Sequence, residues 1–211
     1  MNLRSRLTSF LASVTEEPRR RGAEALFFTG HVGARDRLSS ALYFHLTAGD
    51  WAHRAHTAGY VDSLHVGLDR CRVPTSVLDL GTGGGGSAAA LADRFPQARV
   101  IGVDSSRRML RGARRGFQRP NLRFVRASVT SLPFADDAFD LIVWFNAIPF
   151  PEEVDRVAGP TAELLGVSDF ASPAPATSPW AQRWHDVGFE RSVADDLDGS
   201  GVELFRRLAS D

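Results

Sequence analysis

The chain has 211 residues and is 43% hydrophobic, so it is long enough for one α/β domain with a buried core. Its 25 basic and 25 acidic residues cancel, which leaves no net charge to attract nucleic acid or acidic lipid. Every basic residue is an arginine, and this excludes lysine as a phosphate-binding Walker residue, a Schiff base or a general base. The single cysteine, Cys71, excludes an intramolecular disulfide and a Cys/His zinc cluster.

We expect a cytoplasmic protein, because a single cysteine suits a reducing compartment. The apolar residues among the first 14 are interrupted by Thr8, Ser9 and Ser13, so they lack the continuous apolar core of a signal peptide. No apolar run approaches the roughly 20 residues that a membrane span needs. Abundant alanine, arginine and glycine fit a GC-rich bacterial genome.

Helical patterns dominate the first part of the chain, up to about residue 72. Apolar residues recur at helical spacing over 3–14, again over 38–46, and a third time over 50–68. No strand pattern interrupts them. We therefore predict an N-terminal helical region over 1–72, followed by a second unit over 73–211.

From residue 73 onward, short apolar runs alternate with helical stretches. Strands are predicted at 76–80, 99–103, 122–125, 139–145 and 163–167, and helices at 87–95, 106–117 and 180–187. A terminal hairpin is predicted from 190–194 and 202–207, turning at Asp198 and Gly199. This alternation predicts a mostly parallel, seven-stranded sheet with helices on both faces and an antiparallel C-terminal hairpin, that is, a Rossmann-like doubly wound α/β fold.

A glycine run over 81–86 separates the first predicted strand from the helix that follows it. Glycines at such a turn let the backbone approach a ligand where any Cβ would clash. Gly81, Gly83 and Gly86 satisfy the G-x-G-x-x-G pattern of dinucleotide-binding proteins. The glycines alone leave both a dinucleotide and S-adenosylmethionine open.

Two acidic residues end the first two strands. Asp79 lies two residues before Gly81, where a carboxylate would repel the pyrophosphate of a dinucleotide and attract the ammonium and sulfonium of S-adenosylmethionine. At about 4–6 Å this difference is on the order of several kcal/mol. Asp104 follows Gly81 by 23 residues, a suitable distance for an acid that accepts from ribose hydroxyls, which both ligands contain.

Three segments in order resemble the class I S-adenosylmethionine-dependent methyltransferases, in particular the small-molecule group. They are VLDLGTGGG (77–85), VIGVDSSRRML (100–110) and LPFADDAFDLIV (132–143), with a weaker match in LLGVSDF and WHDVGFE towards the C-terminus. The resemblance implies that Gly81, Thr82 and Gly83 line the methionine moiety of S-adenosylmethionine. It also implies that Asp79 holds the amino group and that Asp104 binds the ribose.

The same resemblance implies the remaining cofactor contacts. Ser105 and Met109 would flank the adenosine, and Ser128 and Val129 would face the adenine. Phe145 would lie where the methyl group is delivered. The N-terminal helical region would close over the substrate pocket as a cap.

Two departures from the family pattern stand out. The family often has an acidic residue at the position of Ser128, and serine accepts a hydrogen bond from the adenine amino group more weakly. The stretch 147–161 looks short for its usual helix, and Pro149, Pro151 and Pro160 further limit a helix there.

Two residues are candidates for catalysis, Asn146 and His56. Asn146 follows the fourth predicted strand, where the resemblance places the reacting centre; the alternative is that it caps the strand end. His56 is one of several N-terminal histidines that could act as a general base. It shares a helix face with His53, but without an obvious third ligand we predict no metal site.

Arginines are dense over 107–119. A nucleic-acid footprint is one interpretation, and a solvated helix face in a protein whose only cation is arginine is the other. Zero net charge favours the solvated face, so we do not expect a nucleic-acid partner.

The sequence thus predicts an S-adenosylmethionine-dependent methyl transfer to an oxygen, nitrogen or carbon of a small molecule. A non-methylating member of the fold, with a binding or assembly role or another cofactor-dependent reaction, is the alternative. An NAD-dependent oxidoreductase is disfavoured by Asp79. No membrane partner is expected, and a homodimer is left open.

Overall fold

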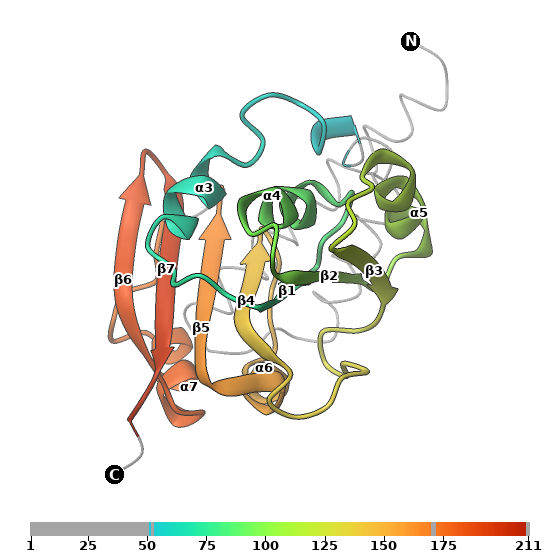
Figure 1. Cartoon of the computed structure of the whole chain (residues 1–211). Helices are drawn as coiled ribbons and strands as arrows, with labels where there is room; N and C mark the ends of the chain where they lie inside the picture. The colour runs from blue at the N-terminus through green and yellow to red at the C-terminus, as the bar shows by residue number, and fades with distance from the viewer. Residues whose placement is uncertain (1–50, 52, 170–171, 210–211) are drawn as a thin grey trace.

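The computed structural model describes residues 51, 53–169 and 172–209 of the chain. Seven strands form one sheet in the order β3-β2-β1-β4-β5-β7-β6 (Figure 1). They are β1 (Ser76–Leu80), β2 (Arg99–Asp104), β3 (Leu122–Arg126), β4 (Phe139–Phe145), β5 (Ala158–Ser168), β6 (Phe189–Leu197) and β7 (Ser200–Arg207). Strands β1–β5 are parallel, whereas β7 is antiparallel to both β5 and β6. The predicted Rossmann-like sheet with its antiparallel C-terminal hairpin is confirmed.

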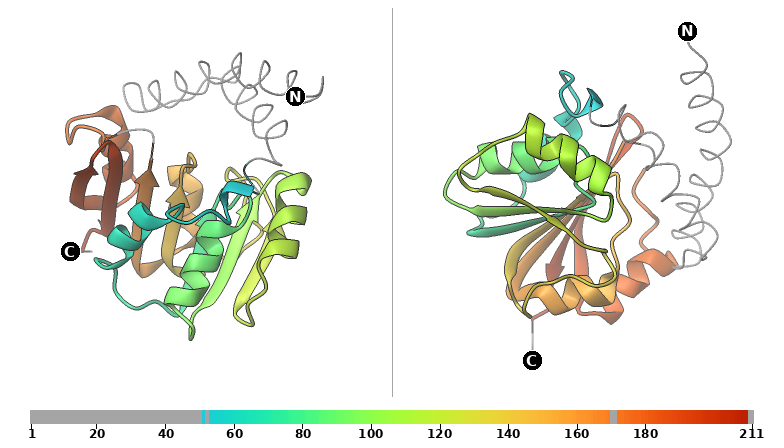
Figure 2. Two further views of the ribbon diagram at one scale, coloured as in Figure 1. Left: turned by 90° about the horizontal axis from the view of Figure 1, so that it is seen from above. Right: turned by 90° about the vertical axis from the view of Figure 1, so that its right-hand side faces the viewer.

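The sheet is covered on both faces. Helices α3 (Asp62–Leu68), α4 (Gly86–Arg94) and α5 (Arg107–Gly116) lie on one face, and α6 (Pro151–Val157) and α7 (Pro179–Asp186) lie on the other (Figure 2). Two hydrophobic cores result, one on each side of the sheet. Because β1 and β4 are central and buried on both faces, they read as continuous apolar runs rather than alternating ones.

The prediction of one continuous helix over 50–68 is wrong. A helical turn around residues 51–54 is followed by turns up to Val61, and α3 begins at Asp62. Gly59 has φ +81°, a left-handed conformation that a continuous helix cannot contain. The predicted helices at 3–14 and 38–46 lie outside the described residues.

Two prolines behave differently from the prediction. Pro151 begins α6 instead of preventing it, because the first helical position needs no N–H donor. Strand β5 starts at Ala158, five residues before the predicted start, and includes Pro160. The ladder with β4 is irregular between Phe139 and Leu141, and such an irregularity tolerates a residue without an N–H.

Helix α3 lies within the predicted N-terminal region and packs on the sheet. A Cβ on Gly67 would lie 2.9 Å from Leu165 of β5 and 3.2 Å from Val202 of β7, so only glycine allows this approach. Among the described residues, no helix is long and apolar enough to cross a membrane.

The strand order places the site. Numbering reverses between β1 and β4, and ligands of open α/β sheets bind outside the carboxyl ends of the strands at such a switch point. The glycine loop follows β1, Asp104 ends β2, and Asn146 directly follows β4. All three therefore lie at the carboxyl ends of the parallel strands.

Candidate functional site

The loop after β1 has a backbone that only glycine adopts freely. Gly81 has φ +71° and Gly83 has φ +52°. A Cβ on Gly81 would lie 2.6 Å from the Cβ of Ala147, which fixes glycine there by contact as well as by conformation. A Cβ on Gly83 would instead meet only the Gly81 carbonyl oxygen, at 3.8 Å, so the space beside Gly83 is open to a ligand.

Asp79 is a buried carboxylate beside this loop. The Ser87 hydroxyl, at the start of α4, donates to Asp79 Oδ2 at 2.7 Å. Asp79 Oδ1 has no hydrogen-bond partner in the described structure, and neither has the buried hydroxyl of Thr82. Burial raises the pKa of Asp79 to about 6, although the hydrogen bond from the Ser87 hydroxyl favours its charged form. A buried carboxylate with an unused oxygen is suited to a ligand that brings a cationic donor.

Asp104 ties the end of β2 to the glycine loop. The Gly83 amide donates to Asp104 Oδ2 at 3.0 Å, and the Ser106 amide donates to Oδ1 at 2.7 Å. Burial raises the pKa of this carboxyl. A carboxylate has about four lone-pair positions, so two remain to accept from a pair of vicinal hydroxyls such as those of a ribose.

Met109 and Ser105 flank Asp104 at the start of α5. Ser106 caps this helix, accepting from the Met109 amide at 3.3 Å. Met109 is buried and packs with Trp51 and Tyr60, whereas Ser105 is exposed. Met109, Trp51 and Tyr60 thus form a small apolar cluster near the start of α5.

Ser128 and Val129 lie in the turn after β3. The Ser128 hydroxyl is 2.8 Å from the Thr130 hydroxyl and accepts from the Thr130 amide at 3.2 Å. Ser128 is exposed, and Val129 is half-buried against the core on the α6 and α7 face. The turn is therefore held by its own hydroxyls, with the Ser128 oxygen facing solvent.

Phe145 is the last residue of β4, and Asn146 follows it. Both contact residues that the sequence analysis did not identify as part of the site. Phe145 is buried and packs edge-on against Tyr60, with ring centroids 5.3 Å apart. Asn146 Nδ2 donates to Asp169 Oδ2 at 3.0 Å, and the Asp169 amide donates back to Asn146 Oδ1 at 2.8 Å. The Ser63 hydroxyl donates to the other carboxylate oxygen of Asp169 at 2.6 Å.

A cavity of about 480 Å³ opens beside this cluster. Asn146 and Asp169 line it from the sheet, Tyr60 and Ser63 line it from the segment around α3, and Leu197 lines it from the β6–β7 hairpin. Its volume lies in the usual range for small-molecule sites. Asp169 could have been identified from its position directly after β5, because the carboxyl end of β5 lies beside that of β4, which Asn146 follows.

Carboxylates lie close to both the glycine loop and the cavity. Burial first, and then the charges of Asp79 and Asp169, raise the pKa of the Tyr60 phenol, and Arg54 at the cavity wall acts in the opposite direction. The carboxylate of Asp79 beside the glycine loop favours a cationic ligand group and disfavours a pyrophosphate. The unpaired atoms of Asp79 and Thr82, together with the open space at Gly83, fit the amino and carboxylate end of S-adenosylmethionine better than they fit NAD.

The structure does not bring His56 to the other predicted site residues. Its ring is exposed and stacks on Phe117 with centroids 4.3 Å apart, at the C-terminal end of α5. Asp104 adjoins the opposite end of this ten-residue helix, which is about 15 Å long. His56 therefore lies away from Asp104 and the glycine loop. The described residues contain no group of three or more His, Cys, Asp or Glu that could hold a metal ion.

Comparisons with known proteins agree with this geometry. The methyltransferase domain family matches residues 77–165. A demethylmenaquinone methyltransferase of Thermus thermophilus is 37% identical over 111 residues, which are 48% of this chain and 50% of that protein. A trans-aconitate 2-methyltransferase of Azoarcus sp. is 48% identical over 82 residues, which are 37% of this chain and 27% of that protein. The chain thus spans about half or less of the length of these curated relatives.

A crystal structure of an S-adenosylmethionine-dependent methyltransferase from Aquifex aeolicus shares the fold. Its TM-score is 0.61 at 20% sequence identity, over 74% of this chain and 97% of that one. At this identity the likeness establishes the architecture.

Proposed function

We propose that this chain methylates a small-molecule acceptor, because its residues 77–165 match the methyltransferase domain family and its fold is shared with an S-adenosylmethionine-dependent methyltransferase. The observation that carries the proposal is the pairing of an unsatisfied buried carboxylate, Asp79, with an open glycine cradle at the switch point of the sheet. S-adenosylmethionine supplies an electrophilic methyl group when it is bound.

The residues at the strand ends would bind the cofactor in a fixed orientation. Asp79 Oδ1 would accept from its ammonium, and Asp104 would accept from the ribose hydroxyls through its remaining lone pairs. Met109 and Ser105 would lie along the adenosine, and Ser128 and Val129 would face the adenine. Alignment of the reacting groups accounts for much of the rate in such a transfer.

The 480 Å³ cavity is the proposed acceptor site. Asn146 and Asp169 would orient the acceptor, since each has polar atoms at the cavity wall and each fixes the other. For an acceptor with a hydroxyl or an amine, the Asp169 carboxylate would take up the proton as the methyl group is transferred. Tyr60 and Trp51 would exclude water from the apolar side of the cavity.

The experiment that tests the proposal is methyl incorporation from S-adenosylmethionine labelled in its methyl group. The panel would hold hydroxy, amino and carboxylic acids and begin with demethylmenaquinone and trans-aconitate, which the relatives' names suggest. Transfer to one class, reduced at least about tenfold by Asp169→Asn, supports the proposal. Tight cofactor binding with no transfer to any acceptor would favour the non-methylating alternative, which the absence of a charged adenine partner at Ser128 also motivates.

A failure of cofactor binding would contradict both the proposed methyl transfer and the non-methylating alternative. Asp104→Ala is expected to weaken cofactor binding at least about tenfold, because it removes both an acceptor for the ribose and the anchor of the Gly83 amide. A cytoplasmic location and a bacterial origin remain predictions from the sequence, which leaves a homodimer open.

A further inference from the structure

The charge of this neutral chain is strongly segregated. Residues 105–126 contain eight arginines and no acidic residue, so the rest of the chain, with 17 arginines and 25 acidic residues, is net negative by eight. One of the eight, Arg119, is paired with Asp93 through two hydrogen bonds of 2.6 and 2.9 Å. The remaining arginines lie on α5 and on β3, the edge strand of the sheet.

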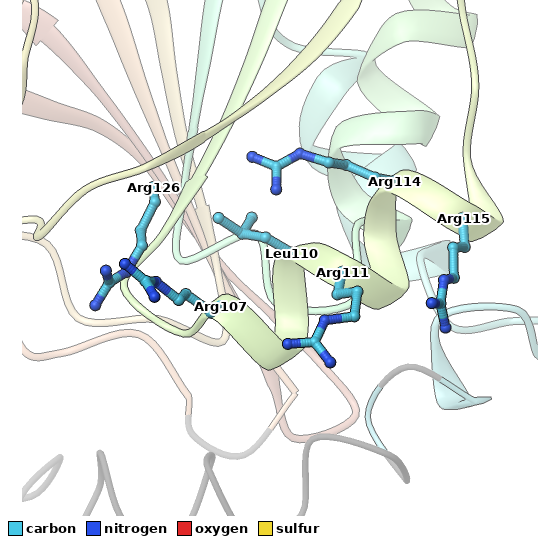
Figure 3. Close-up of a pocket in the computed structure, with 6 residues that line it drawn as sticks. All are labelled: Arg107, Leu110, Arg111, Arg114, Arg115 and Arg126. Carbon is cyan, nitrogen blue, oxygen red and sulfur yellow. The ribbon is translucent and has the colours of Figure 1, made fainter.

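Five of these arginines line one cleft of about 470 Å³ that is formed by α5 and the end of β3 (Figure 3). The lining residues are Arg107, Leu110, Arg111, Arg114, Arg115 and Arg126. Arg126 comes from β3 and the others come from α5, and Arg114 extends past Leu110 towards the strand. None of the described lining residues is acidic.

Backbone carbonyls hold two of the guanidinium groups in place. Arg114 donates to the Phe124 carbonyl oxygen at 2.8 Å, and Arg126 donates through Nε to the Ser105 carbonyl oxygen at 3.0 Å. Within the described part of the chain, the side chains of Arg107, Arg111 and Arg115 make no hydrogen bond or ion pair. The described lining of the cleft thus concentrates like charges without an acidic side chain, and an anion would relieve their repulsion.

The spacing of the charges indicates an extended anion rather than a single one. Arg107 and Arg111 are one turn apart, about 6 Å along the helix, and Arg115 lies about 12 Å from Arg107. One phosphate cannot contact all of them. Guanidinium groups bind phosphate oxygens in a bidentate manner, so a chain of phosphates matches this row of side chains.

We propose that this cleft binds the phosphodiester backbone of double-stranded nucleic acid, without reading its sequence. Among the described residues that line the cleft, none is aromatic, so none offers a surface on which an unpaired base could stack, and this favours a duplex over a single strand. A surface that binds an acidic protein normally contains aromatic side chains that anchor the partner. A surface that binds an anionic membrane normally contains exposed apolar residues. The exposed large hydrophobic residues of the described structure, Val66 and Val73, lie outside this surface.

The first 50 residues contain seven arginines and five acidic residues, so their net positive charge does not complement that of the cleft. The sequence alone favoured a solvated helix face. The structure adds the concave surface, the contribution from β3 and the guanidinium groups fixed by carbonyls. The inference does not depend on the proposed methyl transfer.

The test measures binding of the full chain to a fluorescein-labelled duplex of about 20 base pairs, as RNA and as DNA, by anisotropy between about 50 and 200 mM KCl. The cleft variant is Arg107→Gln with Arg111→Gln. The control variant, Arg94→Gln with Arg99→Gln, makes the same charge change on the α4 and β2 ends. Both variants are expected to keep the thermal midpoint and the S-adenosylmethionine affinity of the parent.

We expect saturable binding of at least one duplex. The cleft variant should weaken it roughly tenfold or more and reduce the slope of log K against log salt by about two, because two phosphate contacts are lost. The control should change the slope by much less. Equal losses in both variants would overturn the proposal, since they would reflect general charge. Binding of sodium tripolyphosphate or of phosphatidylglycerol vesicles at the cleft, without duplex binding, would also overturn it.

Discussion

Asn146 and Asp169 exchange two hydrogen bonds across the carboxyl ends of β4 and β5, although 23 residues separate them in the chain. Asn146 is held at φ +58°, a left-handed conformation that is uncommon for any residue other than glycine. The pair thus stores backbone strain at the wall of the proposed acceptor cavity, where such strain is often associated with function.

The strain and the hydrogen bonds can be separated by two substitutions. Asn146→Ala should lower the free energy of unfolding by about 2 kcal/mol, since it loses both side-chain bonds and keeps the unfavourable φ. Asn146→Gly loses the same bonds but adopts this φ readily, so it should be about 1 kcal/mol more stable than the alanine variant. Urea unfolding measures both values. Equal stabilities would contradict the strained conformation.

Asp79 should destabilise the cofactor-free protein at neutral pH. Its folded pKa of about 6 exceeds the ordinary value of 3.8 because of burial, so stability falls as the pH rises from about 4 through 6. Asp79→Asn should therefore raise the free energy of unfolding at pH 7 by up to about 3 kcal/mol, a gain that shrinks towards pH 4.

Asp140 provides the matched control, with the opposite sign. Burial opposes its ionisation, but four hydrogen bonds from the amides and hydroxyls of Thr75 and Ser76 outweigh this and lower its pKa. Asp140→Asn should reduce stability at pH 7, and the difference should shrink as the pH falls through the acidic range. Unfolding titrations from about pH 2 to 8 check both, because the contribution of Asp140 is lost only below its ordinary pKa of 3.8. Destabilisation by Asp79→Asn at pH 7 would contradict the burial argument.

The raised pKa of Asp79 also predicts a pH dependence of cofactor affinity. The ammonium of S-adenosylmethionine favours ionised Asp79, so affinity should rise with pH up to a plateau above about 6, with proton release on binding near pH 6. Calorimetry in buffers of different ionisation enthalpy measures that release. Asp79→Asn should bind the cofactor at least about tenfold more weakly and show no such dependence. A flat profile in the parent protein would argue against Asp79 as the ammonium partner.

Two glycines of the loop should behave differently on substitution by alanine. Gly81→Ala should destabilise the protein by roughly 2 kcal/mol or more, because its Cβ would overlap Ala147 and its φ is left-handed. Gly83→Ala should lower stability by only about 1 kcal/mol, yet abolish cofactor binding, because its Cβ fills the space meant for the ligand. Thermal unfolding and cofactor titration separate these effects. Unimpaired binding by Gly83→Ala would show that the cofactor does not lie there.

Much of the architecture was predictable because it is encoded locally. The bounds of β1 and β4 were predicted to the residue, since buried parallel strands are continuous apolar runs between breakers. The terminal turn at Asp198 and Gly199 was predicted for a similar reason, and both residues have the positive φ that a tight hairpin requires.

The rest depended on contacts between distant parts of the chain. Helix α6 and the early start of β5 were missed, because the position of a proline relative to a helix start or a strand irregularity is set by tertiary structure. Asp104 was singled out correctly as a strand-end acid, but its hydrogen bond to the Gly83 amide was not predictable. Asp169 was missed altogether, since its partner Asn146 becomes its neighbour only when β4 and β5 pair.

The most direct test of the central claim is calorimetric titration of the full chain with S-adenosylmethionine and, separately, with NAD. The site predicts saturable binding of one S-adenosylmethionine per chain and no binding of NAD, because the buried carboxylate of Asp79 attracts the first ligand and repels the pyrophosphate of the second. Binding of NAD alone, or of neither ligand, would contradict the account.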